Sequence, residues 1–125
     1  MFDKISFTLT LYTSLTYTSF VEFIEAPAFT KNVYAYMSDD DYADLQLYLF
    51  QHPESSDLIS GSGGIRKLRW VVPKKNKCKR GGARVNYYFK KQGVEIWLLT
   101  LHSKGEAANI SSHVLKQIAK EIEYD

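Results

Sequence analysis

The chain has 125 residues, a formal net charge of +2, 45% hydrophobic residues and 14% aromatic residues. This length predicts a single domain, and the apolar content excludes a globally disordered chain. The only cysteine, Cys78, excludes an internal disulfide and fits a reducing cytosol, so we expect a cytoplasmic protein. No run of 18 apolar residues occurs, which excludes a membrane-spanning helix.

Residues 1–19 are rich in Thr, Ser and Tyr, and apolar and polar residues alternate from Ile5 to Leu11 as they do in a strand. The segment is too polar for the unbroken apolar centre of a secretory signal. Two interpretations stay open: an added edge strand or loose arm, or an extension upstream of a natural start near Phe20. We therefore treat residues 1–19 as an N-terminal extension and residues 20–125 as one domain.

The first part of the domain predicts one strand and two helices. Residues 20–25 (FVEFIE) alternate between apolar and polar, which is typical of a half-buried strand. Pro27 suits the first turn of a helix. Ser38 can cap a second helix, with three aspartates stabilising its positive N-terminal end, and Pro53 marks the exit of that helix. Only a cap separates the two helices, so we expect a helical hairpin.

The second part predicts a meander of strands and a closing helix. Residues 58–64 (LISGSGG) are expected to form a loop and residues 73–82 a cationic turn. The expected strands are residues 65–72, 83–89 and 94–101. The last of these, VEIWLLTL, is nearly continuous in apolar residues, so it should be a central strand buried on both faces. Ser111 or Ser112 caps the final helix. The fold class is therefore α+β, an antiparallel sheet packed by two N-terminal helices and a C-terminal helix.

Positive charge is concentrated between Ile65 and Phe89, and no Asp or Glu occurs between Asp57 and Glu95. The cations are Arg66, Lys67, Arg69, Lys74, Lys75, Lys77, Lys79, Arg80 and Arg84. A local cationic field that contains aromatic side chains suits a phosphate backbone with bases to stack against. The alternative is a solvated basic hairpin that only aids solubility.

Strand periodicity groups some of these cations. Lys67 and Arg69 are two residues apart and should project together, while Arg84 shares a strand face with Asn86 and Tyr88. Lys104 stands just beyond the third strand. An antiparallel meander could bring these cations to one sheet face, where they would hold a phosphodiester.

Other motifs predict no cofactor and no metal. The glycines of residues 61–64 lack the Gly-Lys-Ser/Thr ending of a P-loop, and a strand follows them instead of a helix. The histidines His52, His102 and His113 form no His-x-x-x-His pair, and there is no Cys-x-x-Cys pair. A structural role is the favoured interpretation of His102.

Several segments together resemble a known family. They are GGIRKLR (residues 63–69), KRGGARV (79–85), YYF (87–89), LLTL (98–101) and KGE (104–106). In this order and spacing the chain resembles the RelE/HigB-type toxins of bacterial type II toxin–antitoxin systems, in the HigB-like branch, over residues 20–123. The resemblance implies a RelE-like, microbial RNase-type fold. It also implies a metal-independent endoribonuclease that cleaves mRNA in the ribosomal A site, inhibits translation and arrests growth.

The resemblance also assigns residues and partners. It implies catalytic roles for Lys67, Arg69, Arg84 and Lys104, with Gly105 standing where some members have arginine. It implies RNA-binding roles for Arg66, Lys77, Lys79, Arg80 and Tyr88. The expected partners are the ribosome with its mRNA and a cognate helix-turn-helix antitoxin. The toxin itself is not expected to bind operator DNA; only the antitoxin would connect the two. Two rival functions stay open: a non-catalytic toxin of the same fold that binds a protein such as DNA gyrase, and a plain RNA-binding module.

Overall fold

The computed structural model describes residues 5–12, 18–71, 82–103 and 110–124. Within these ranges it contains six strands and three helices. In chain order they are β1 (Ile5–Tyr12), β2 (Thr18–Glu25), α1 (Pro27–Tyr36), α2 (Asp39–Gln51), β3 (Asp57–Leu58), β4 (Ile65–Trp70), β5 (Ala83–Lys90), β6 (Glu95–Ser103) and α3 (Ser112–Glu123). The α+β class and the three expected helices are confirmed.

The described strands form one sheet in the order β1-β2-β6-β5-β4-β3. The expected meander of β4, β5 and β6 is present, and each of its neighbouring pairs is antiparallel. The expectation of a fully antiparallel sheet is wrong, because β2 pairs in parallel with β6. A parallel pair needs a long crossover between its strands, and here α1, α2 and the strands β3 to β5 lie between β2 and β6 in the chain. The sheet is therefore mixed.

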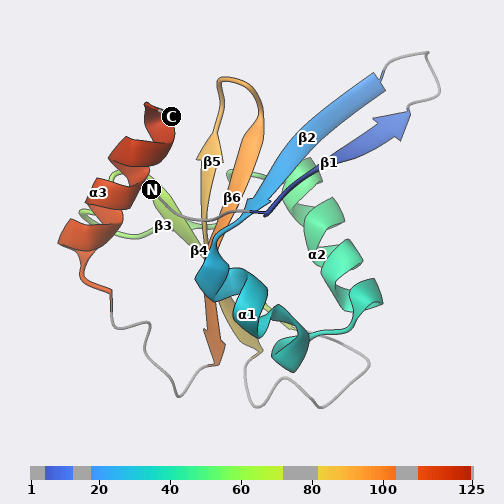
Figure 1. Cartoon of the computed structure of the whole chain (residues 1–125), viewed down its shortest axis with the longest axis horizontal. Coiled ribbons are helices and arrows are strands. Elements are labelled where there is room, and N and C mark those ends of the chain that lie inside the picture. The colour runs from blue at the N-terminus through green and yellow to red at the C-terminus, as the bar shows by residue number, and fades with distance from the viewer. Residues whose placement is uncertain (1–4, 13–17, 72–81, 104–109, 125) are drawn as a thin grey trace.

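Helices cover both faces of the sheet. In Figure 1, α1 and α2 lie on one side and α3 lies on the other. Phe29 of α1 and Leu45 of α2 belong to a core with Leu98 of β6, whereas Leu115 of α3 belongs to a second core with Trp97 of the same strand. Residues 96–99 are all at most 3% exposed. The prediction of a central strand buried on both faces is confirmed.

The helix starts follow local chemistry. Pro27 occupies the first turn of α1. The Ser38 hydroxyl accepts a hydrogen bond from the Asp41 amide at 3.2 Å, and the Asp41 carboxylate accepts one from the Ser38 amide at 3.0 Å. This reciprocal capping box starts α2 as expected. Of the two serines considered for the start of α3, it is Ser111 whose side chain caps the helix.

A buried carboxylate joins β2 to the helical hairpin. Glu25 is 7% exposed and accepts hydrogen bonds from the Tyr42 hydroxyl at 2.6 Å and the Thr30 hydroxyl at 2.7 Å. Burial, and next the hydrogen bond to Glu25, raise the pKa of Tyr42 far above its usual value. Tyr42 therefore stays a neutral donor, and these bonds fix α1 and α2 against the sheet.

Candidate functional site

The register of the meander places two arginines and a histidine in one line across three strands. Arg69 of β4 pairs with Arg84 of β5, and Arg84 pairs with His102 of β6. Directly paired residues in antiparallel strands project to the same face, with their Cβ atoms about 4.5–5.5 Å apart. The three side chains therefore form a cross-strand row.

A second row lies next to the first. Lys67 of β4 pairs with Asn86 of β5, and Asn86 pairs with Thr100 of β6. Asn86 is 3% exposed, and its amide donates a hydrogen bond to the Thr100 hydroxyl at 3.0 Å. Among the described residues, no donor reaches its buried Oδ1 atom. Asn86 is thus a buried polar side chain, held by Thr100, beside the cations.

The two rows lie on the side of the sheet that carries α3. Ile65 packs in the core of α3, and Lys67 and Arg69 follow it at alternate positions of the same strand. Ile65 is fully buried, whereas Lys67 and Arg69 are exposed and Arg84 and His102 are half-buried. We call Lys67, Arg69, Arg84 and His102 the cationic face.

Like charges on directly opposed strand positions destabilise a sheet. An anion bound between Arg69 and Arg84 would interact with both guanidinium groups. Asp57 of β3 pairs with Lys67, so an acidic residue borders the second row. The site is electrostatically prepared for a phosphate, because planar guanidinium groups donate in pairs to phosphate oxygens.

His102 reaches the cationic face because β6 is irregular. The pairing jumps from Tyr87–Leu98 to Asn86–Thr100, so β6 carries one extra residue, Leu99. Strict alternation after Trp97 would turn His102 to the opposite face, whereas the bulge reverses the phase beyond it. Sequence periodicity therefore missed His102 as a site residue, and the sequence carries no clear signal of the bulge.

Arg66, expected to bind RNA, lies away from the cationic face. It alternates with Lys67, so it projects to the side of α2. Its Nη1 donates hydrogen bonds to the carbonyl oxygens of Glu54 at 2.9 Å and Ser56 at 2.6 Å. Its Nη2 lies 3.8 Å from the Glu54 carboxylate, which also pairs with Lys91. Arg66 thus holds the segment that follows α2.

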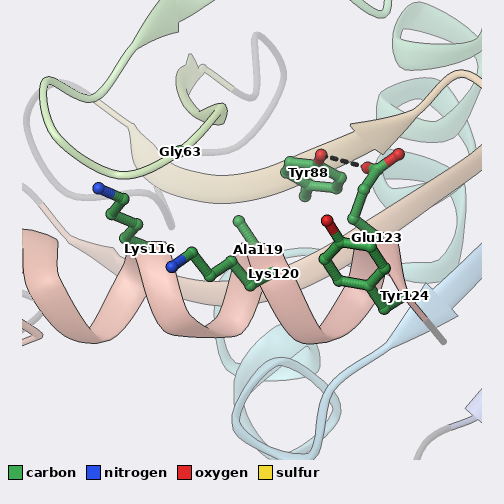
Figure 2. A pocket seen from close by; sticks show the side chains of 7 residues that line it. All are labelled: Gly63, Tyr88, Lys116, Ala119, Lys120, Glu123 and Tyr124. Atoms are coloured by element: carbon green, nitrogen blue, oxygen red, sulfur yellow. Dashed lines mark hydrogen bonds between the residues drawn. The ribbon is translucent and has the colours of Figure 1, made fainter.

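Tyr88 lies on the same side of the sheet as the cationic face, beneath α3. Its hydroxyl donates a hydrogen bond to Glu123, and Figure 2 shows this pair at one end of a pocket. Burial, and next the bond to Glu123, raise the pKa of Tyr88 to about 12. Tyr88 is thus next to the candidate site rather than in its two rows.

The remaining predicted residues lie outside the described ranges: Lys77, Lys79, Arg80 and Lys104. The structure does describe Gly82, which returns the chain into β5 with a φ of +75°. A Cβ atom at this position would lie 2.2 Å from the Trp70 carbonyl oxygen. Glycine is therefore required for Ala83 to pair with Trp70 and for Arg84 to reach its place opposite Arg69.

The arrangement can bind a phosphate and move a proton. Two guanidinium groups can stabilise negative charge that develops on phosphate oxygens, and an adjacent imidazole can give or accept a proton. Within the part of the chain that the structure describes, no three His, Cys, Asp or Glu side chains gather as they would around a metal ion. None of the helices in these ranges is long and apolar enough to cross a membrane. No family model matches the sequence.

Proposed function

We propose that this protein is the toxin of a type II toxin–antitoxin pair and acts as a ribosome-dependent mRNA endonuclease of the RelE/HigB type. The observation that supports the proposal best is the row of Arg69, Arg84 and His102 on one sheet face. The order of elements within residues 20–125, two helices before a meander and one after it, is compatible with a RelE-like fold.

The proposed reaction needs no group beyond the RNA and protein side chains. The ribose 2′-oxygen attacks the adjacent phosphorus, and the bond from phosphorus to the 5′-oxygen of the next nucleotide breaks. The products are a 2′,3′-cyclic phosphate and a free 5′-hydroxyl. One proton leaves the 2′-hydroxyl and one joins the departing oxygen, so both a base and an acid are required.

The cationic face offers a group for each electrostatic task. Arg69 and Arg84 would hold the nonbridging phosphate oxygens, whose negative charge grows in the transition state. Lys67 would add a point charge from the second row, and His102 would exchange one of the two protons. The ribosome would align the mRNA for in-line attack, so cleavage of free RNA should be weak.

The proposed partners follow from the resemblance. The toxin would bind translating ribosomes in the A site, and a helix-turn-helix antitoxin would neutralise it. The same cations could also bind RNA without cutting it, which makes a plain RNA-binding module the main competing outcome of the test.

Primer-extension mapping on translating ribosomes tests the proposal. Wild-type protein should produce new mRNA 5′ ends at A-site codons. Arg84→Ala should reduce the cleavage rate by about 10²–10³-fold, as loss of one transition-state donor does elsewhere. Lys31→Ala, which changes an exposed lysine on α1, serves as the control and should cleave normally.

The outcomes separate the alternatives. Growth arrest without A-site cuts would favour a toxin that binds a protein target. Protection of RNA without cuts would favour an RNA-binding module. Undiminished growth arrest by Arg84→Ala at equal expression would remove Arg84 from the proposed active site.

A further inference from the structure

A pocket of about 180 Å³ opens between α3, β5 and the glycine-rich loop before β4. It is lined by Gly63, Tyr88, Lys116, Ala119, Lys120, Glu123 and Tyr124. Figure 2 shows a division within it: the tyrosine rings and the Glu123 carboxylate gather at one end, and the lysine ammonium groups lie toward the other. Neither the fold nor the proposed cleavage site requires this division.

Small residues keep the pocket open. Gly63 has a φ of +78°, and a Cβ atom there would lie 3.4 Å from the Ala119 Cβ atom. A Cβ atom on Gly64 would lie 3.0 Å from the Tyr88 ring. The fully buried Ser62 fixes this loop, because its hydroxyl donates to the Ile59 carbonyl at 2.6 Å and accepts from the Ile65 amide at 3.0 Å. The walls of the pocket are therefore held in place.

The cationic end carries an electrostatic cost. Lys116 and Lys120 are exposed and four residues apart on α3, so they are neighbours on one helix face. A like-charge pair at this spacing destabilises a helix by about 0.2–0.5 kcal/mol. The Glu123 carboxylate accepts a hydrogen bond from the Tyr88 hydroxyl at 2.5 Å, at the other end of the pocket. An anionic group between the lysines would remove the cost.

The aromatic end offers two kinds of contact. Tyr88 is half-buried, and Tyr124 is 88% exposed, so a planar ring could stack against either tyrosine. The Glu123 carboxylate is an acceptor only, and Tyr88 engages one of its two oxygens. It suits a ring whose edge presents N–H donors. A nucleotide carries both groups, a ring with N–H donors and a phosphate.

We propose that this pocket binds one nucleotide of single-stranded RNA, with guanine preferred at the Glu123 end and the phosphate between Lys116 and Lys120. Guanine presents two adjacent donors, N1–H and the 2-amino group, and can meet a carboxylate with both. Adenine and cytosine each place a ring-nitrogen acceptor beside their amino group, which a carboxylate repels. Uracil flanks its single N–H with two carbonyl oxygens.

The position of the pocket connects it to the cationic face. Arg84, Asn86 and Tyr88 occupy alternate positions of β5 and share one sheet face. Four residues of strand span about 13 Å, so a single RNA strand could contact Arg84 and reach the pocket a few nucleotides away. The role of the pocket in substrate selection rests on the proposed function, whereas binding of a nucleotide in it does not.

Titration of the full-length protein with GMP, AMP, CMP and UMP, followed by amide shifts in α3 and β5, tests this inference. GMP should bind at least about tenfold more tightly than UMP, a difference of about 1.4 kcal/mol. Glu123→Gln should abolish the preference for GMP, because an amide offers one acceptor and one donor where guanine needs two acceptors. Glu121→Gln, on the same helix but outside the pocket lining, is the matched control and should keep the preference.

The phosphate end has its own test. Lys120→Ala should weaken GMP several-fold more than it weakens guanosine, because only GMP carries the phosphate. Equal affinity for all four nucleotides, shifts outside α3 and β5, or an unchanged preference in Glu123→Gln would overturn the inference.

Arg84→Ala separates this inference from the proposed cleavage. The variant should lose A-site cleavage and still bind GMP. Cleavage by the wild type without GMP binding would reject the pocket alone, and GMP binding without cleavage would reject the nuclease alone.

Discussion

Arg69 and Arg84 show how a single pairing register can create a site. Each arginine by itself would be an ordinary strand cation, yet the register sets them directly opposite each other. The position of His102 depends in the same way on one extra residue in β6. Side chains that are 15 and 18 residues apart in the sequence thus become neighbours through backbone pairing.

Gly82 is the residue on which that register depends, and its replacement gives a prediction about stability. Gly82→Ala should destabilise the fold by more than about 1–3 kcal/mol, because a contact with the Trp70 carbonyl at 2.2 Å adds to the strain of a positive φ. Gly93→Ala is the matched control. Its φ is also positive, at +89°, but its nearest neighbour would lie 3.7 Å away.

Urea denaturation of the two variants measures the difference. The free energy of unfolding of the Gly93 variant should fall only by the cost of placing alanine at a positive φ. Equal losses for both variants would mean that the Gly82 contact relaxes without cost and that the register of β4 and β5 does not depend on it.

His102 carries the second prediction at this scale. His102→Gln should lower A-site cleavage by about 10²–10⁴-fold if the imidazole exchanges a proton in the reaction. His113→Gln, which changes an exposed histidine of α3, should cleave as the wild type does. Single-turnover rates on stalled ribosomes give the comparison, and the pH profile of the His102 variant should lose one ionisation. An unchanged profile would assign His102 to structure.

The elements differ in how far sequence could predict them. Pro27, the Ser38 capping box and Ser111 act within one helical turn, so the helix starts could be read from neighbouring residues. The parallel pairing of β2 with β6 depends on a contact across most of the chain, and no local pattern encodes it. The two-residue strand β3 is too short to show a period.

In the candidate site too, local alternation predicted some positions, whereas contacts between distant elements determined others. Alternation placed Lys67 with Arg69 and Arg84 with Asn86, and the pairing register bears this out. The same alternation did not reveal that Arg66 would be engaged by carbonyl oxygens after α2, because that contact comes from a separate element. It also failed at His102, where the bulge changes the phase of the strand.

The cap of α2 gives a prediction at the element scale. Ser38→Ala should lower the free energy of unfolding by about 0.5–2 kcal/mol, because the Asp41 amide loses its side-chain acceptor. Ser60→Ala, at an exposed turn position, is the control. Thermal or urea unfolding of both variants provides the measurement. No loss in the Ser38 variant would show that the Asp41 carboxylate, which accepts from the Ser38 amide, holds the helix start by itself.

At the scale of the whole molecule, the sheet separates the helical hairpin of α1 and α2 from the cationic face. β1 is the outer strand of the described sheet, and β2 lies between it and the meander of β6, β5 and β4 (Figure 1). Val21 and Phe23 of β2 belong to the core with α1 and α2, and Ile24 belongs to the core with α3. The strand on which α1 and α2 pack at this end of the sheet is therefore β2. The strands β5 and β4, which carry the arginines, lie beyond β6 from β2.

This arrangement predicts that a variant starting with Met followed by residues 20–125 folds and still cleaves mRNA on ribosomes. β2 would keep its parallel pairing with β6 from Glu22 to Glu25 and would become the sheet edge. Stability should fall because the pairing with β1 is lost, while unfolding should remain cooperative and the cleavage sites should not move. Full-length Leu9→Pro is the matched variant: Leu9 pairs with Val21, the position next to Glu22, whose amide bonds away from β1, so proline at Leu9 removes a ladder donor from β1 without shortening the chain. Its stability should lie between those of the wild type and the truncated chain. Failure of the truncated chain to unfold cooperatively, with Leu9→Pro failing as well, would show that β1 is an essential strand of the sheet and that the domain begins before residue 20.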